Sequence, residues 1–270
     1  MARTYDTSSN PTVEIRDITD IIKPDYMSYA VALYLRSIPN AIDGLKPVQR
    51  RILYTMFINK IFNFEKCVSI VGQTAQLVTT GDASIYDALV LLGQVDRVRY
   101  PLIVSQGNFG FLNSSTLNSP AAARYTEAHL SEYARDFYFT EDIMFADMTE
   151  NYNGKLKEPS VLPTLLPMAY IQGSNGIAAG YRNYMLPHNL HKLADCYIKF
   201  LEEKNKTVSD FSKLEIYITK HLKIDLNKNK SKIIRESATG LKTGQGQVVM
   251  QGTFHTEPSK YGRTKIVVTE

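Results

Sequence analysis

Apolar residues at intervals of three and four predict the first helices of this chain. The stretch 28–36 (SYAVALYLR) has this spacing, and Ser28 is a residue type that favours the helix N-cap. The preceding residues 1–24 are polar and interrupted by Pro11 and Pro24, so we expect them to form an arm.

A second helix is predicted to begin at Pro47, because proline suits the first turn of a helix. Its apolar stripe comprises Val48, Ile52, Leu53, Met56 and Phe57. This stripe leaves Gln49, Arg50 and Lys60 on other sides of the helix. The turn residues 43–44 (DG) separate the two helices, so the pattern is typical of a helix-turn-helix.

A helix is also predicted from Gly81-Asp82 to about Gly93, followed by a strand at 100–104 and a glycine-rich surface loop at 106–110. From Thr126 onward, apolar residues again recur at helical spacing. We therefore expect the neighbouring residues Arg124 and Tyr125 to lie at or just before a helix start.

A second region is indicated after residues 152–154 (YNG), where the composition changes and a proline-rich run follows at 159–167. It contains the small-residue stretch 173–180 (GSNGIAAG). We expect a helix at about 189–203 and strands near 247–254 and 265–269.

The composition is that of a soluble globular protein. Hydrophobic residues make up 44% of the 270 residues, and the net charge is +4, which argues against intrinsic disorder. The two cysteines and five histidines form no metal-binding pattern. With no apolar run long enough for a membrane span and no secretory signal, we expect a cytoplasmic protein.

Tyr125 is the residue that we consider as a candidate nucleophile. A free tyrosine is almost fully protonated at pH 7, so a nucleophilic tyrosine needs a base or a positive charge beside it. Arg124 can supply part of that charge. On residue type alone, packing is the commoner role for a tyrosine.

Several motifs, in one order along residues 25–270, resemble those of the breakage-reunion subunit of type IIA DNA topoisomerases, as in the A subunit of gyrase or the medium subunit of phage topoisomerases. The matching motifs are 29–30 with 36–39 (YA, RSIP), 43–53 (DGLKPVQRRIL), 81–87 (GDASIYD), 106–110 (QGNFG), 121–127 (AAARYTE), 176–180 (GIAAG), 187–190 (PHNL) and 243–246 (TGQG) through 268–270 (VTE).

The resemblance implies an α+β fold with an N-terminal arm at 1–24, a winged-helix DNA-gate domain at 25–150 and an incomplete tower domain at 151–270. Tyr125 matches the tyrosine that attacks a DNA phosphodiester and forms a 5′-phosphotyrosyl link. Arg124 matches the arginine that stabilises the phosphate charge in the transition state.

Further residues match the family's DNA contacts. Ile177 matches the wedge that enters a base-pair step, although an isoleucine can equally belong to a core. The expected phosphate contacts are Arg36, Lys46, Arg50, Arg51 and Thr80. The sequence departs from the gyrase pattern by having Thr79-Thr80 where gyrases have two histidines, Gln49 where many relatives have histidine, and Ala83 in place of a serine.

The resemblance also implies partners. Mg²⁺ and ATP would be bound by a separate metal-binding and ATPase subunit, and the chain would self-associate at the DNA gate around double-stranded DNA. The apolar edge 266–268 (IVV) would accept a complementary C-terminal fragment. If the gene is phage-borne, the location would be the bacterial host cytoplasm. The alternatives are a non-catalytic winged-helix DNA-binding fragment and a purely structural fragment.

Overall fold

The computed structural model describes residues 17–95, 97–98, 100–112, 117–185, 187–188, 190–191, 193–195, 198, 254–258 and 262–268. The chain divides into two compact units, Met1–Pro187 and His188–Glu270. This boundary lies after the one expected at residue 150. None of the helices in the described ranges combines the length and apolar composition that a membrane crossing requires.

The first helix, α1 (Ile18–Ser37), is longer than predicted and has no buried residue. Its N-cap is Asp17, whose carboxylate accepts a hydrogen bond from the Thr19 amide at 2.7 Å, so the expected cap at Ser28 is wrong. Pro24 lies inside this helix, where it removes one backbone hydrogen-bond donor. Residues 18–24 are therefore helical rather than part of an arm.

Three helices form the centre of the first unit: α2 (Pro47–Ile58), α3 (Cys67–Thr74) and α4 (Asp82–Gly93). They pack against one another in pairs. The predicted starts at Pro47 and after Gly81 are confirmed. Fully buried side chains from these helices include Ile52, Leu53, Met56, Ile70, Ile85 and Leu89.

A small antiparallel sheet borders these helices. Its strand order is β1 (Glu65–Lys66), β5 (Glu127–Leu130) and β2 (Ile103–Gln106). The predicted helix starting at Thr126 is wrong, because β5 is the central strand and pairs on both edges. The helix α5 (Glu132–Tyr138) begins later, where the Ser131 hydroxyl caps it by accepting from the Ala134 amide at 3.0 Å.

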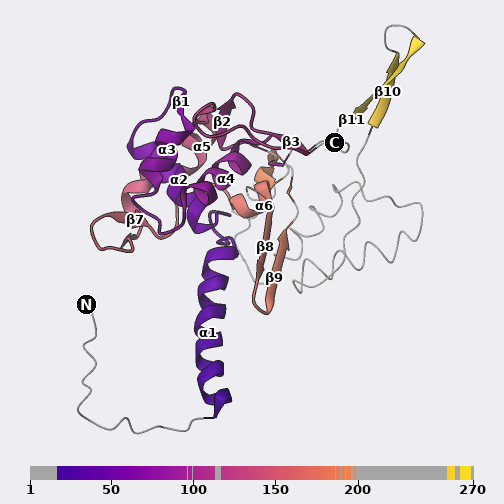
Figure 1. Cartoon of the computed structure of the whole chain (residues 1–270). Helices are drawn as coiled ribbons and strands as arrows, with labels where there is room; N and C mark the ends of the chain where they lie inside the picture. The colour runs from indigo at the N-terminus through magenta and orange to yellow at the C-terminus, as the bar shows by residue number, and fades with distance from the viewer. Residues whose placement is uncertain are drawn as a thin grey trace, which may run out of the picture. The chain divides into compact units, whose positions relative to one another are not determined.

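Shorter elements complete the first unit. Strands β3 (Phe111–Leu112) and β4 (Leu117–Asn118) pair, as do β6 (Met148–Glu150) and β7 (Lys157–Pro159). A 3-10 helix covers Glu141–Phe145, and α6 covers Met168–Gln172. Strands β8 (Ser174–Ala178) and β9 (Tyr181–Met185) form a hairpin that extends beside α1 (Figure 1).

The described part of the second unit contains one hairpin. Strand β10 (Phe254–Pro258) pairs antiparallel with β11 (Thr264–Val268), and Ile266 lies opposite Thr256. The predicted strand at 265–269 is thus confirmed, and its apolar edge is paired on one side. Described residues between 190 and 198 are helical, which agrees with the start of the helix predicted at about 189–203. The rest of that helix, and all of the strand predicted near 247–254 except Phe254, lie outside the described residues.

The loop between α1 and α2 is organised by Asp43, whose side chain is fully buried. Its carboxylate accepts hydrogen bonds from Arg50 Nε at 2.6 Å and Nη2 at 3.0 Å, and from the Leu45 and Leu162 amides at 2.9 and 3.0 Å. Its backbone carbonyl accepts from the Tyr138 hydroxyl at 2.9 Å. One residue therefore joins this loop to α2, to α5 and to the segment before α6.

The same interaction corrects the predicted position of Arg50. The helical pattern places Arg50 away from the buried side of α2, yet its side chain is 9% exposed and lies against Asp43. Its Nη2 also donates to the Leu45 carbonyl at 3.2 Å. Arg50 is buried because a fully buried carboxylate needs a charged partner.

We expect Asp43→Asn to lower the free energy of unfolding by about 3 to 5 kcal/mol, because it leaves the Arg50 guanidinium buried without its counter-charge. Urea unfolding at neutral pH measures this change. The matched control is Glu132→Gln, which breaks a 3.6 Å ion pair whose carboxylate is 87% exposed and should cost less than about 1 kcal/mol. Equal unfolding midpoints for Asp43→Asn and the parent chain would show that this ion pair does not stabilise the fold.

Candidate functional site

Tyr125 lies on an exposed turn that directly precedes strand β5. Its amide donates to the Ala122 carbonyl at 2.9 Å, and its side chain is 64% exposed. The guanidinium carbon of Arg124 lies 4.7 Å from the centre of the Tyr125 ring. The turn therefore presents a phenol and a cation to solvent together, a pair that can supply a nucleophile and an anion-binding group.

The start of helix α3 holds this turn from one side. The Cys67 amide donates to the Thr126 carbonyl at 3.0 Å, and the Val68 amide donates to the Ala123 carbonyl at 3.2 Å. These two backbone bonds bracket Arg124 and Tyr125. The turn is consequently anchored on both of its flanks while its side chains stay exposed.

Helix α4 holds the turn through Tyr86. The Tyr86 hydroxyl donates to the Ala121 carbonyl at 2.6 Å and lies 2.9 Å from Thr126 Oγ1. Burial raises the pKa of Tyr86, so the hydroxyl keeps its proton and remains a donor at neutral pH. Sequence patterns do not reveal this role, because Tyr86 is distant in sequence from the turn and its motif does not indicate which partner it contacts.

The glycine-rich loop after β2 supports the same turn. The Ala121 amide donates to the Asn108 carbonyl at 2.9 Å. Gly107 has a φ of +97°, and a Cβ there would lie 3.5 Å from Thr126 Cα. This loop is therefore packed next to the Tyr125 turn, and Gln94 Nε2 fixes it further by donating to the Phe109 carbonyl at 2.7 Å.

The predicted phosphate contacts differ in their accessibility. Arg36 is exposed in the last turn of α1, and Thr80 is exposed just before α4. Lys46 occupies the N-cap position of α2, where partial burial lowers the pKa of its amine. Gln49 stabilises this helix start, because its side-chain oxygen accepts from the Lys46 amide at 2.9 Å.

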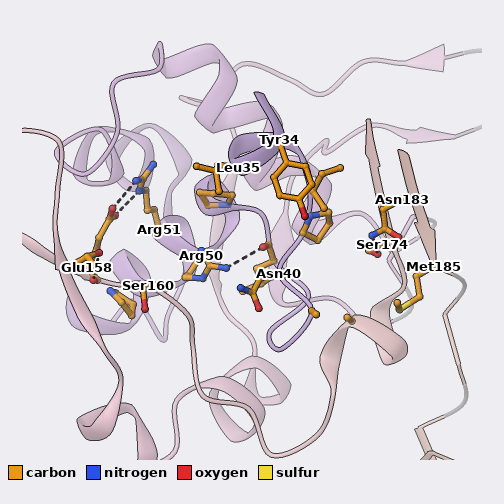
Figure 2. Close-up of a pocket in the computed structure, with 18 of the residues that line it drawn as sticks. Tyr34, Leu35, Asn40, Arg50, Arg51, Glu158, Ser160, Ser174, Asn183 and Met185 are labelled. Carbon is orange, nitrogen blue, oxygen red and sulfur yellow. Dashed lines mark hydrogen bonds and ion pairs between the residues drawn. The ribbon is translucent and has the colours of Figure 1, made fainter. Parts of the chain in front are cut away.

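Arg51 is held by an acidic side chain. Its Nε and Nη2 donate to the two carboxylate oxygens of Glu158 on β7, at 2.5 and 2.7 Å. The Arg51 side chain is 30% exposed and that of Glu158 is 11% exposed. Figure 2 shows this pair in the lining of an open pocket of about 840 Å³, to which the β8–β9 hairpin contributes Ser174 and Asn183.

Ile177 lies near the end of the β8–β9 hairpin and is 66% exposed. The strands close with Ala178 opposite Tyr181, and Gly180 has a φ of +72° in the connecting turn. Glycine adopts this left-handed conformation without strain. The structure thus excludes a buried core role for Ile177 and leaves its side chain free to contact a ligand.

Among the residues that the structure describes, no three or more His, Cys, Asp or Glu side chains gather where they could hold a metal ion. Mg²⁺ prefers carboxylate and water oxygens in near-octahedral geometry. A Mg²⁺ ion held by only one or two carboxylates would complete its coordination with oxygens of water or phosphate.

Comparison with known proteins places the chain in a family. A family model for the A subunit of DNA gyrase/topoisomerase IV matches residues 36–270. The DNA gyrase A subunit of Borreliella burgdorferi is 37% identical over 262 residues, which cover 94% of this chain and 31% of the relative.

Two other relatives agree. The DNA gyrase A subunit of Mycobacterium tuberculosis H37Rv is 36% identical over 265 residues, and that of Thermotoga maritima is 35% identical over 263 residues. These matches cover 96% and 94% of this chain, and 31% of each relative. The chain thus spans about 31% of the length of these curated relatives. Since the family model covers residues 36–270, the chain belongs to the family of DNA gyrase and topoisomerase IV A subunits.

Proposed function

We propose that this chain carries the DNA cleavage-religation site of an ATP-dependent type IIA topoisomerase. The Tyr125 oxygen attacks a DNA phosphorus, the phosphorus–O3′ bond breaks, and a 5′-phosphotyrosyl link and a free 3′-hydroxyl remain. The tyrosine proton passes to water, and the 3′-oxygen takes a proton from water. The 3′-hydroxyl can later attack the link and restore both the DNA and Tyr125, so religation needs no further energy source. A second duplex passes while the break is open.

The observation that carries this proposal is the exposed Tyr125 beside Arg124 on a turn anchored by backbone bonds. A nucleophile must keep a fixed position relative to the scissile phosphate, because misplacement by about 1 Å can cost about 100-fold in rate. The bonds from Cys67, Val68 and Tyr86 supply this fixation. Arg124 then stabilises the additional negative charge on phosphate in the transition state.

We propose that α2, α3, α4 and the β1–β5–β2 sheet form a winged-helix DNA gate. Phosphate contacts that do not read sequence suit an enzyme acting at many sites. For Arg50 we propose a supporting role, since its guanidinium holds the loop that leads to Lys46. The direct contacts are assigned to Arg36, Lys46, Arg51 and Thr80. Residues 151–270 would belong to a tower domain.

Other chains would supply the metal ion, the nucleotide and the second half of the DNA gate. We propose that Mg²⁺ and ATP are bound by a second, metal-binding and ATPase subunit, and that two copies of this chain meet at the DNA gate. Mg²⁺ would supply charge stabilisation for phosphate when bound. A complementary C-terminal fragment pairing with β11 stays a prediction, as does a location in the cytoplasm of a bacterium or phage host.

We expect Tyr125→Phe to reduce covalent protein–DNA complex by more than about 100-fold, because it removes the nucleophilic oxygen. DNA affinity should stay within a few-fold of the parent value. The thermal unfolding midpoint should stay within a few degrees of it. The assay mixes the chain with its partner subunit, Mg²⁺, ATP and supercoiled plasmid, and traps the complex with detergent.

The matched control for this assay is Tyr152→Phe, which removes the hydroxyl of a tyrosine that is 59% exposed elsewhere on the first unit. It should cleave like the parent. Undiminished cleavage by Tyr125→Phe would reject the assignment. Binding of DNA by the parent chain without any cleavage would instead support the non-catalytic DNA-binding alternative.

Arg51 Nε and Nη2 both donate to Glu158, so this ion pair must open before the same two nitrogens can donate to a phosphate. Glu158→Gln should therefore tighten DNA binding several-fold and steepen the dependence of log K on log salt concentration by about one phosphate contact, or about 0.9. The control Glu150→Gln removes the same charge from β6 of the same hairpin. Salt titrations by fluorescence anisotropy compare the two. Equal slopes for both variants would show that Arg51 does not bind phosphate.

A further inference from the structure

The β8–β9 hairpin has one side whose residues are all exposed. Asn175 lies opposite Tyr184, and Ile177 lies opposite Arg182. Directly opposed residues in an antiparallel pair point to the same side of the sheet. These four residues therefore share one side, which we name the outward face. All four are exposed, with Ile177 at 66% and Tyr184 at 65%.

The opposite side of the hairpin is anchored to α1. The ring of Tyr181 lies edge-on to that of Tyr34 with centroids 5.4 Å apart. A Cβ on Gly176 would lie 2.7 Å from the Ser37 carbonyl oxygen, so the strand passes against the end of α1. Asn183, whose side chain also lines the pocket in Figure 2, donates to Ser174 across the strands at 2.9 Å. The outward face is therefore displayed by a supported hairpin (Figure 1).

The chemistry of the outward face suits nucleic acid. Residues 174–185 (SNGIAAGYRNYM) include one arginine and no acidic residue. A guanidinium binds phosphate, an aromatic ring stacks on bases or sugars, and an apolar side chain can enter a base-pair step. The positive charge favours a polyanion such as DNA over a neutral or basic partner surface.

The spacing also fits a duplex. Opposed side chains on paired strands lie about 5 Å apart, and residues two positions apart on one strand lie about 7 Å apart. Successive phosphates of one DNA strand advance about 3.4 Å along the helix axis. The step from Ile177 to Arg182 and then to Tyr184 thus spans a few base-pair steps.

We infer that the outward face binds DNA as a unit: Arg182 contacts a phosphate beside the step that Ile177 enters, and Tyr184 packs on the neighbouring nucleotide. This inference rests on the proposed function, because it takes duplex DNA as the ligand of Ile177. It adds Arg182 and Tyr184, which neither the family motifs nor the small-residue stretch 173–180 includes. Together they hold the bent duplex against the wedge.

The test measures binding and bending of a fluorescently labelled duplex of about 30 base pairs by the full chain. We expect Arg182→Ala to lower the salt slope by about 0.9, the contribution of one phosphate contact. Tyr184→Ala should weaken binding about 10-fold without changing the slope, since stacking is uncharged. Both variants, and Ile177→Ala, should reduce the bend reported by energy transfer between the duplex ends.

Matched controls are Lys155→Ala and Tyr152→Ala, which remove an exposed cation and an exposed tyrosine from the turn between β6 and β7. They should bind and bend DNA like the parent, and all variants should unfold at similar urea concentrations. Parent-like binding, slope and bending by Arg182→Ala and Tyr184→Ala would overturn the inference. So would intact DNA binding combined with lost association with the partner subunit, because the face would then be a protein interface.

The outcomes separate this inference from the proposed cleavage function. If the parent chain cleaves through Tyr125 while the hairpin variants bind normally, the inference alone fails. If the hairpin variants lose binding and bending while the parent never forms a covalent complex, the inference stands and the proposed cleavage function fails. Binding and bending do not require the Tyr125 hydroxyl, so the two readouts are independent.

Discussion

The ion pair between Asp43 and Arg50 is the interaction on which the first unit depends most. A fully buried carboxylate accepts from one guanidinium and from two amides, while its backbone carbonyl accepts from Tyr138. These bonds join the loop after α1 to α2, to α5 and to the segment before α6. Breaking a buried pair by removing one partner is costly, so this arrangement favours a single geometry for the loop from which α2 starts.

The Tyr125 turn differs from this buried ion pair, because its backbone is anchored while its reactive side chains stay exposed. Backbone bonds from the start of α3 and the Tyr86 hydroxyl of α4 hold the turn, while Tyr125 and Arg124 face solvent. The α4 helix therefore links two of the family motifs, since it begins after Gly81 and fixes the turn through Tyr86. We propose that this coupling keeps the nucleophile in place when DNA is bound.

Local signals predicted part of this structure well. The starts of α2 at Pro47 and of α4 after Gly81 follow from turn and cap residues, and the family follows from the order of motifs. Contacts between residues that are far apart in the sequence explain why the other predictions were wrong. The helix predicted from Thr126 begins only at α5, because residues 127–130 pair on two edges as strand β5. The helical pattern predicts that Arg50 is exposed, yet its side chain is buried in an ion pair with Asp43. The roles of Tyr86 and Glu158 depend on contacts that no local pattern encodes.

The proposed mechanism requires that Tyr125 becomes covalently joined to a 5′ phosphate of DNA. Tandem mass spectrometry of the trapped complex, after digestion by protease and nuclease, tests this directly. We predict a nucleotide attached through its 5′ phosphate to the peptide containing Tyr125, at the Tyr125 oxygen. A nucleotide on any other residue, or a link through a 3′ phosphate, would contradict the mechanism.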